Sequence, residues 1–118
     1  MIDAFTHGRR SLSQVRQEIE SGERIGLSAL VLFEWLRGPR TPEEIGVQEA
    51  LFPTAGAVPF GPEEAMRAAD LYRTLSRPRA RAVDLAIAAC ALVHGAELWT
   101  LNPEDFEDIP DLTLHRPR

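Results

Sequence analysis

The sequence predicts an α/β protein, a three-layer α/β/α sandwich around a mostly parallel sheet. Short apolar segments that follow a glycine or a turn alternate with segments of helical periodicity, as in proteins whose parallel strands are buried between helices. The chain has 118 residues, enough for one domain over 1–118 but not for two. Hydrophobic residues make up 44% and charged residues 26%, an ordinary globular balance, so we expect a packed core.

The expected elements alternate along the chain. Helices are predicted where apolar residues recur every three or four positions and a glycine, a proline or a capping residue marks an end. They cover 11–21, 29–37, 41–52, 61–75 and 84–94. Strands are predicted over 24–28, 57–60, 97–100 and 112–114, with a turn over 102–106. In the fourth helix the expected packing face consists of Ala65, Ala68, Ala69, Tyr72 and Leu75.

The charged residues restrict the function. The net charge of -5 argues against a broad basic surface for nucleic acid, although a cation bound at an acidic site would make that site locally positive. The chain contains no lysine, which excludes Schiff-base chemistry and the lysine of a phosphoacceptor receiver domain. A Gly-rich dinucleotide-binding loop is also missing.

The single cysteine and the apolar runs indicate the cellular compartment of the protein. Cys90 lies in an apolar run, so it is expected to be buried, and one cysteine allows no disulfide within the chain. This fits a reducing compartment. The sequence shows no apolar run long enough to span a membrane and no signal segment. Together these features predict a cytoplasmic protein.

Two acidic residues stand out in apolar helices. Glu34 interrupts the apolar helix over 29–37, where it marks either a thin solvent-facing stripe or a carboxylate carried into a cleft beside a cation. Asp84 begins the apolar helix over 84–94 and is expected to be its N-cap. A helix N-terminus also keeps a carboxylate ionised, as a metal ligand must be, so both roles are compatible.

Two further polar residues follow the strand that ends at Thr100. Asn102 and Asp105 stand three apart across a proline, the spacing of a helix cap with an acidic first turn. The same loop comes at the carboxyl end of a predicted strand, where active sites of parallel α/β folds collect. Each acid therefore has both a structural and a functional interpretation.

Three blocks of sequence, taken together, favour the functional interpretation. They are Ser28 to Gly38, in which a strand ending in Ser runs into a helix with an acid and a closing Gly; Asp84 to Ala89 with His94-Gly95-Ala96; and Thr100 to Phe106 with Ile109-Pro110-Asp111-Leu112. In this order they resemble the PIN-domain family, and VapC-like toxin ribonucleases in particular. The resemblance covers nearly the whole chain, and the last two blocks are its specific part.

The resemblance implies a site, a reaction and partners. Glu34, Asp84 and Asp105 are carried over as catalytic acids that bind Mg²⁺ or Mn²⁺, with Asn102 as a further metal-site residue and Thr100 as a hydroxyl near the site. The implied reaction is hydrolysis of RNA phosphodiester bonds by the toxin of a VapBC-type toxin–antitoxin system. The implied partners are RNA, a VapB-like antitoxin and a second copy of the chain, which would pair through the helices after Gly38.

The sequence departs from the family pattern at its start. That pattern opens with a strand ending in Asp-Thr-Ser and continues to a second Ile-Asp-Ala, and Met1 to Phe5 matches only the second part. We expect that the reading frame was assigned from an internal Met, which omits the first strand and the first catalytic Asp and impairs activity. The alternative is a degenerate, non-catalytic PIN-like domain that binds RNA or protein. Codons in frame upstream of Met1 distinguish the two.

Four arginines precede the second acidic helix: Arg73, Arg77, Arg79 and Arg81. They form either a solvated loop or a contact for the RNA backbone, supplied by Arg79 and Arg81. The three histidines show no metal-ligand spacing, and none is assigned to chemistry.

Overall fold

The structure is a computed structural model that describes residues 2–3, 17, 20, 25–100 and 102–116. Its described strands are β1 (Ile2–Asp3) and β2 (Ile25–Gly26), and its described helices are α2 (Ala29–Leu36), α3 (Pro42–Leu51), α4 (Pro62–Thr74) and α5 (Ala82–Val93). Three short 3-10 turns complete the order: η1 (Thr54–Gly56), η2 (Pro78–Arg81) and η3 (Pro103–Asp105). Most of the predicted helix over 11–21 lies outside the described residues.

The helix ends follow the local signals in the sequence. Ser28 caps α2 by accepting a hydrogen bond from the Val31 amide at 3.2 Å. Thr41 and Glu44 form a capping box at the start of α3, with each side chain accepting a hydrogen bond from the other residue's backbone amide. Gly95, at φ +62°, follows α5 in the left-handed conformation that glycine adopts at helix ends. The helices predicted over 29–37, 41–52 and 61–75 are confirmed to within two residues.

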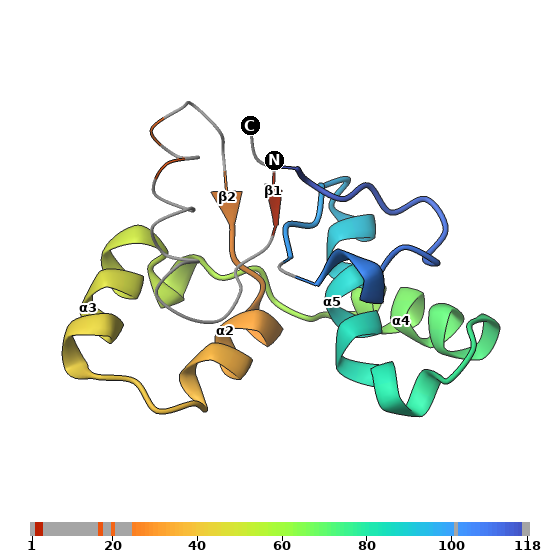
Figure 1. Cartoon of the computed structure of the whole chain (residues 1–118), viewed down its shortest axis with the longest axis horizontal. Coiled ribbons are helices and arrows are strands. Elements are labelled where there is room, and N and C mark those ends of the chain that lie inside the picture. Colours follow the sequence, from red (N-terminus) through yellow and green to blue (C-terminus); the bar gives the residue numbers. More distant parts are fainter. Residues whose placement is uncertain (1, 4–16, 18–19, 21–24, 101, 117–118) are drawn as a thin grey trace.

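The strand pairing is parallel but short. β1 and β2 pair with Ile2 opposite Ile25, and single parallel bridges join Ser28 to Val58 and Leu98 to Leu114. The strands predicted over 57–60, 97–100 and 112–114 are thus represented only by isolated bridges. In Figure 1, α3 lies on one side of β1 and β2, and α4 and α5 lie on the other. This arrangement is consistent with a three-layer sandwich, while a larger parallel sheet stays a prediction.

The core is built around α5. Four consecutive small residues of this helix, from Ala88 to Ala91, are fully buried, including Cys90. α5 packs closely against α4 and also contacts α2, whose Trp35 is 1% exposed. Phe106 and Ile109, which follow η3, close the same core from the C-terminal segment. Burial on nearly all sides explains why α5 is almost wholly apolar. No helix in the described part of the chain is both long and apolar enough to cross a membrane.

The packing face of α4 differs from the prediction. Its inward stripe consists of Glu64, Ala68, Leu71 and Leu75, whereas the alanines at 65 and 69 and the tyrosine at 72 are exposed. The stripe has regular helical spacing, but it begins at a charged residue. The predicted face left that residue out and was therefore shifted by one position along the helix. Burial of Glu64 is compatible with its charge because its carboxylate accepts a hydrogen bond from the Gly61 amide at 2.9 Å and lies 3.4 Å from His94.

Candidate metal and nuclease site

Three separate elements carry the candidate acids. Glu34 belongs to α2, Asp84 to the first turn of α5, and Asp105 to the end of η3. The charges of Glu34 and Asp105 both act on Asp84 and raise its pKa. Glu34 and Asp105, which are 71 positions apart in sequence, therefore both lie near enough to Asp84 to affect its pKa.

The surroundings of Asp84 raise the pKa of its carboxyl group. Partial burial is the largest cause of its raised pKa, followed by the negative charges of Glu34 and then Asp105, while the positive charge of Arg81 acts in the opposite direction. Burial and like charges both disfavour the carboxylate form. A carboxyl group with this combination of causes is typical of functional sites, because a bound cation or a proton would relieve both.

The prediction that Asp84 is the N-cap of its helix is wrong. α5 begins two residues earlier, at Ala82, and Arg81 occupies the N-cap position without a side-chain capping bond. The 3-10 turn η2 leads directly into α5, so the helical backbone starts before the acid is reached. Asp84 is consequently a residue of the first turn, where the positive end of the helix dipole favours its ionised form.

Glu34 lies at the edge of the buried side of α2. Its side chain is 19% exposed and forms an ion pair with Arg37 at 3.4 Å, one turn further along the helix. The helix buries Trp35 on one side and exposes Phe33 on the other. Glu34 is therefore partly buried, and its negative charge contributes to the raised pKa of Asp84.

Local hydrogen bonds hold the turn after Thr100 in place. The Asn102 amide donates to the Thr100 hydroxyl at 3.1 Å, and the Asp105 amide donates to the Asn102 carbonyl at 3.0 Å. Asn102 precedes η3, but its side chain makes no capping bond, and it is exposed. Phe106, 6% exposed, anchors the end of the turn in the core. The turn predicted over 102–106 is confirmed.

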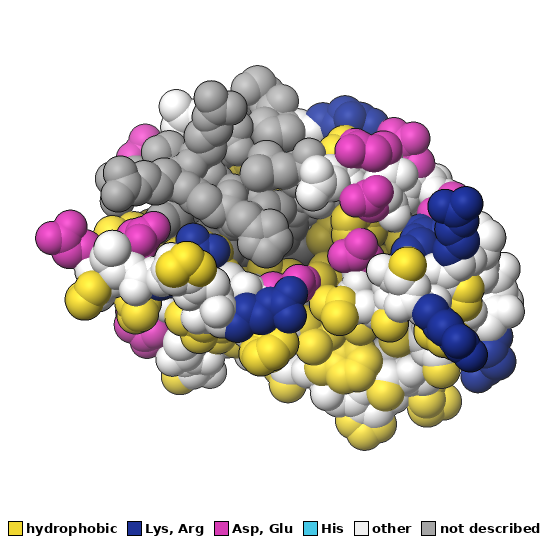
Figure 2. Space-filling model, turned by 60° about the horizontal axis from the view of Figure 1, so that its bottom comes forward, with side chains coloured by type: hydrophobic (Ala, Val, Ile, Leu, Met, Phe, Trp, Pro, Cys, Tyr) yellow, Lys and Arg dark blue, Asp and Glu magenta, His cyan; other side chains and the backbone are white. Residues whose placement is uncertain are grey.

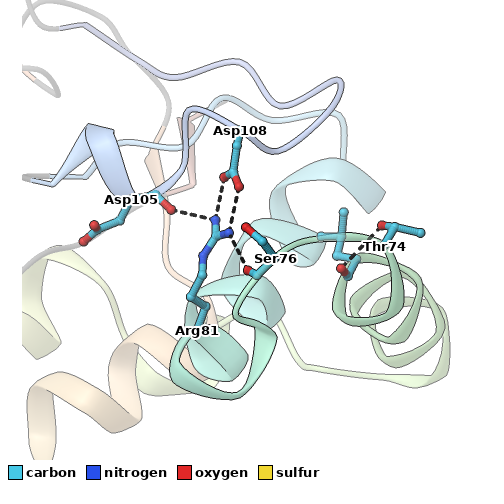
Figure 3. A network of polar contacts seen from close by, with 6 residues as sticks. Thr74, Ser76, Arg81, Asp105 and Asp108 are labelled. Atoms are coloured by element: carbon cyan, nitrogen blue, oxygen red, sulfur yellow. Dashed lines mark hydrogen bonds and ion pairs between the residues drawn. The ribbon is translucent and has the colours of Figure 1, made fainter.

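Arg81 contacts this turn directly. Its guanidinium donates to both carboxylate oxygens of Asp108, at 2.8 and 2.6 Å, and to the backbone carbonyl of Asp105 at 2.9 Å (Figure 3). The ion pair lowers the pKa of Asp108. Sequence reasoning missed Asp108 because its partner lies 27 residues away and no local pattern links the two. Arg79, in contrast, is exposed.

One face of the molecule carries both signs of charge. Figure 2 shows several acidic side chains in a row on one face, with arginines to the left and right of that row. Such a face can attract a divalent cation at its centre and phosphate groups at its edges, although the chain as a whole is acidic.

The donor chemistry of the site suits a hard divalent cation, since Mg²⁺ and Mn²⁺ prefer carboxylate oxygens. The raised pKa of Asp84, caused first by burial and then by the charges of Glu34 and Asp105, is compatible with the same conclusion. Among the residues with described positions, however, no three Asp, Glu, His or Cys side chains lie close enough together to form a complete metal site. A cation site formed by the described acids therefore stays a prediction.

Comparison with known proteins identifies the fold. The PIN domain profile matches residues 1–112. The chain therefore belongs to the PIN domain family. None of the curated proteins compared with this PIN domain matches it.

Solved structures agree with the family assignment. This PIN domain is similar to a chain of the DNA-bound VapBC from Salmonella typhimurium, with 21% identity, 98% of both chains covered and a TM-score of 0.69. A chain of VapBC-1 from nontypeable Haemophilus influenzae is 20% identical, with 98% and 97% of the two chains covered and a TM-score of 0.67. FitAcB from Neisseria gonorrhoeae gives 20% identity, 99% and 98% coverage and a TM-score of 0.67. At these identities the similarity establishes a shared fold.

Proposed function

We propose that this PIN domain is a divalent-metal-dependent endoribonuclease and the cytoplasmic toxin of a VapBC-type toxin–antitoxin pair. One observation carries the proposal: in a PIN fold, the charges of Glu34 and Asp105 converge on the partly buried Asp84. Clustered carboxylates at a helix N-terminus and a neighbouring turn are what phosphodiester hydrolysis with Mg²⁺ or Mn²⁺ requires.

Each residue has a proposed role. A bound divalent cation lowers the pKa of water and offsets charge on the phosphate oxygens. Asp84 would hold this cation directly or through water, and Asp105, with Asn102 beside it, would support a second one. Glu34 would bind the cation or orient the attacking water. Two contacts to RNA complete the proposal, the exposed guanidinium of Arg79 to the backbone and the hydroxyl of Thr100 near the reacting phosphate.

The proposed partners are an antitoxin and a second copy of the chain. The fold similarity to chains from VapBC structures supports the first. The surface of α2 supports it as well, because Phe33 and Leu36 are 60% and 39% exposed and line an open hollow of about 440 Å³ next to Arg37. An antitoxin segment that covers this apolar surface would also contact Arg37, the ion-pair partner of Glu34. Homodimer formation would be visible as a concentration-dependent mass in sedimentation.

Metal removal tests the catalytic proposal. We expect any cleavage of RNA by the purified chain to require Mg²⁺ or Mn²⁺ and to stop when EDTA is added, because the bound cation lowers the pKa of the attacking water. Asp84→Asn should abolish cleavage. The matched control is Asp70→Asn, which removes an exposed carboxylate from α4 that pairs with Arg73.

Two outcomes would contradict the proposal. Cleavage that continues in EDTA would exclude the metal mechanism. A folded chain that binds RNA but cleaves none with either metal would instead support the non-catalytic RNA-binding module.

A further inference from the structure

We infer that Arg81 and Asp108 form a clamp that positions Asp105 beside the first turn of α5, which makes Arg81 a positioning residue of the site and not an RNA contact. The function of this clamp rests on the proposed nuclease activity, whereas the clamp itself can be tested without it.

The clamp joins two segments that carry different acids. Arg81 is the residue before α5 and stands three positions before Asp84. Asp108 stands three positions after Asp105, at the other side of the buried Phe106. A two-pronged contact between a guanidinium and a carboxylate fixes both distance and orientation, because its two hydrogen bonds lie in one plane. The start of α5 and the segment after η3 are therefore held at a set spacing.

The guanidinium also binds the Ser76 carbonyl at 3.4 Å and, more closely, Asp105 itself. Arg81 binds the backbone carbonyl of Asp105, and Figure 3 shows the Asp105 carboxylate pointing away from the guanidinium. The backbone is thus held while the carboxylate stays available. η3 is only three residues long, so its few internal hydrogen bonds cannot fix its position relative to α5.

The same geometry argues against a role for Arg81 in RNA binding. Both terminal nitrogens donate to protein oxygens, and the Arg81 side chain is 17% exposed. A phosphate contact would require the guanidinium to leave a bidentate carboxylate. Arg79 carries the same charge two residues earlier and is exposed, so it is the better candidate for RNA.

Hydrogen exchange tests the clamp independently of activity. Asp108→Asn and Arg81→Lys each remove the paired geometry while keeping a polar side chain. We expect the amides of Asp105 and Phe106, which donate to the carbonyls of Asn102 and Pro103, to exchange about tenfold faster or more, the effect of losing a charge-assisted hydrogen bond. The matched controls are Asp70→Asn and Arg73→Lys, which break an Arg–Asp pair on the surface of α4 and should leave these amides unchanged.

Metal affinity and turnover provide the second readout. We expect both clamp variants to bind Mn²⁺ roughly 10- to 100-fold more weakly and to lose kcat by a similar factor, with a smaller change in KM for RNA. The double variant Arg81→Lys/Asp108→Asn should be little worse than either single variant, because the two residues act as one unit. If Arg81 instead contacted RNA, Asp108→Asn would free it, and RNA binding would be unchanged or tighter with kcat intact.

The results separate this inference from the proposed function. Unchanged exchange at Asp105 and Phe106 in folded Asp108→Asn protein overturns the clamp, whatever the activity. Suppose that exchange at these amides is faster in Asp108→Asn but the wild-type chain cleaves no RNA. That result upholds the clamp and overturns the proposed nuclease activity. Circular dichroism and thermal melting establish that the variants are folded, and Asp108→Asn is the milder change because the Asp108 side chain is 50% exposed.

Discussion

Among single residues, Asp84 combines the strongest evidence for function with a penalty for stability. Burial and the charges of Glu34 and Asp105 raise its pKa above the ordinary value of 3.8 that applies to the unfolded chain. The unfolded state therefore holds the ionised carboxylate more readily than the folded state does. The penalty is absent below the unfolded pKa, grows as the pH rises, and is complete above the folded pKa. Asp108 has the opposite effect, since its lowered pKa gives stability that is lost as the pH falls through its folded value.

The raised pKa of Asp84 yields a prediction for the variant Asp84→Asn. We expect the variant to raise the free energy of unfolding of the metal-free chain at pH 7, because it removes a disfavoured charge, even though it abolishes cleavage. The gain should shrink as the pH falls and vanish below about 3.8, where the wild-type residue is protonated in both states. Urea titrations between pH 3 and pH 8 measure this. If the variant were no more stable than the wild type at pH 7, this would contradict a raised pKa of Asp84 in the folded chain.

Arg79 provides a second prediction at this scale. We expect Arg79→Ala to weaken RNA binding and to reduce the slope of log K against log salt by about 0.7, the value for one phosphate contact with a single strand. Arg73→Ala is the control, because Arg73 is an exposed arginine on α4 already paired with Asp70. Binding titrations at several salt concentrations give the slope. Equal slopes for wild type and Arg79→Ala would remove Arg79 from the RNA surface.

Between elements, the main support of the site is the packing of α4 against α5. The two helices pack against each other, and Leu71 of α4 belongs to the same buried cluster as Ala88, Ala89 and Ala91 of α5. Because α5 also contacts α2, the same helix sets the position of Asp84 relative to Glu34. Loss of packing on the α4 side should therefore loosen the whole framework.

Substitutions on α4 test its corrected packing face. Leu71→Ala should lower the free energy of unfolding by about 2 to 5 kcal/mol, because Leu71 is 5% exposed and the change leaves a cavity. Met66→Ala on the same helix should change it by no more than about 0.5 kcal/mol, since Met66 is 70% exposed. Chemical denaturation compares the two. Similar losses for both would show that the outward face of α4 is covered in solution.

The elements differ in how far the sequence predicts them. Helix ends are governed by local chemistry, and Thr41 with Pro42 and Glu44 places the start of α3 correctly for that reason. Strands depend on partners far away in the sequence, so the segments around Val58 and Leu114 pair less than their apolar patterns indicate. The burial of Glu64 could not be predicted, because it depends on contacts with Gly61 and His94 that no local pattern reveals.

In the molecule as a whole, the site could be predicted in part. The order of motifs predicts Glu34, Asp84 and Asp105 as the acids, and the charges of Glu34 and Asp105 both act on Asp84 in the structure. Their role in catalysis stays a prediction. The clamp could not be predicted, because Arg81 and Asp108 become neighbours only once α5 and η3 have packed. RNA contacts, the metal ions and the partners remain predictions.

Cation binding should be visible in the stability of the whole chain. We expect Mn²⁺ to raise the melting temperature in a saturable way, with a gain of about 2.7 kcal/mol when its concentration is 100 times the Kd. Asp84→Asn should show little of this shift. Sodium chloride at matched ionic strength is the control for general screening of the net charge of -5. A shift of equal size with sodium would indicate screening without a specific site.

The distribution of the acids over distant elements also has a consequence during protein synthesis. Glu34 leaves the ribosome first, and Asp105 is added 71 residues later. Contacts between residues so far apart in sequence form only after the intervening chain has collapsed and packed. A nascent chain therefore carries no assembled acid cluster, and a translating ribosome is exposed to it only after the last of the three elements has been made and folded.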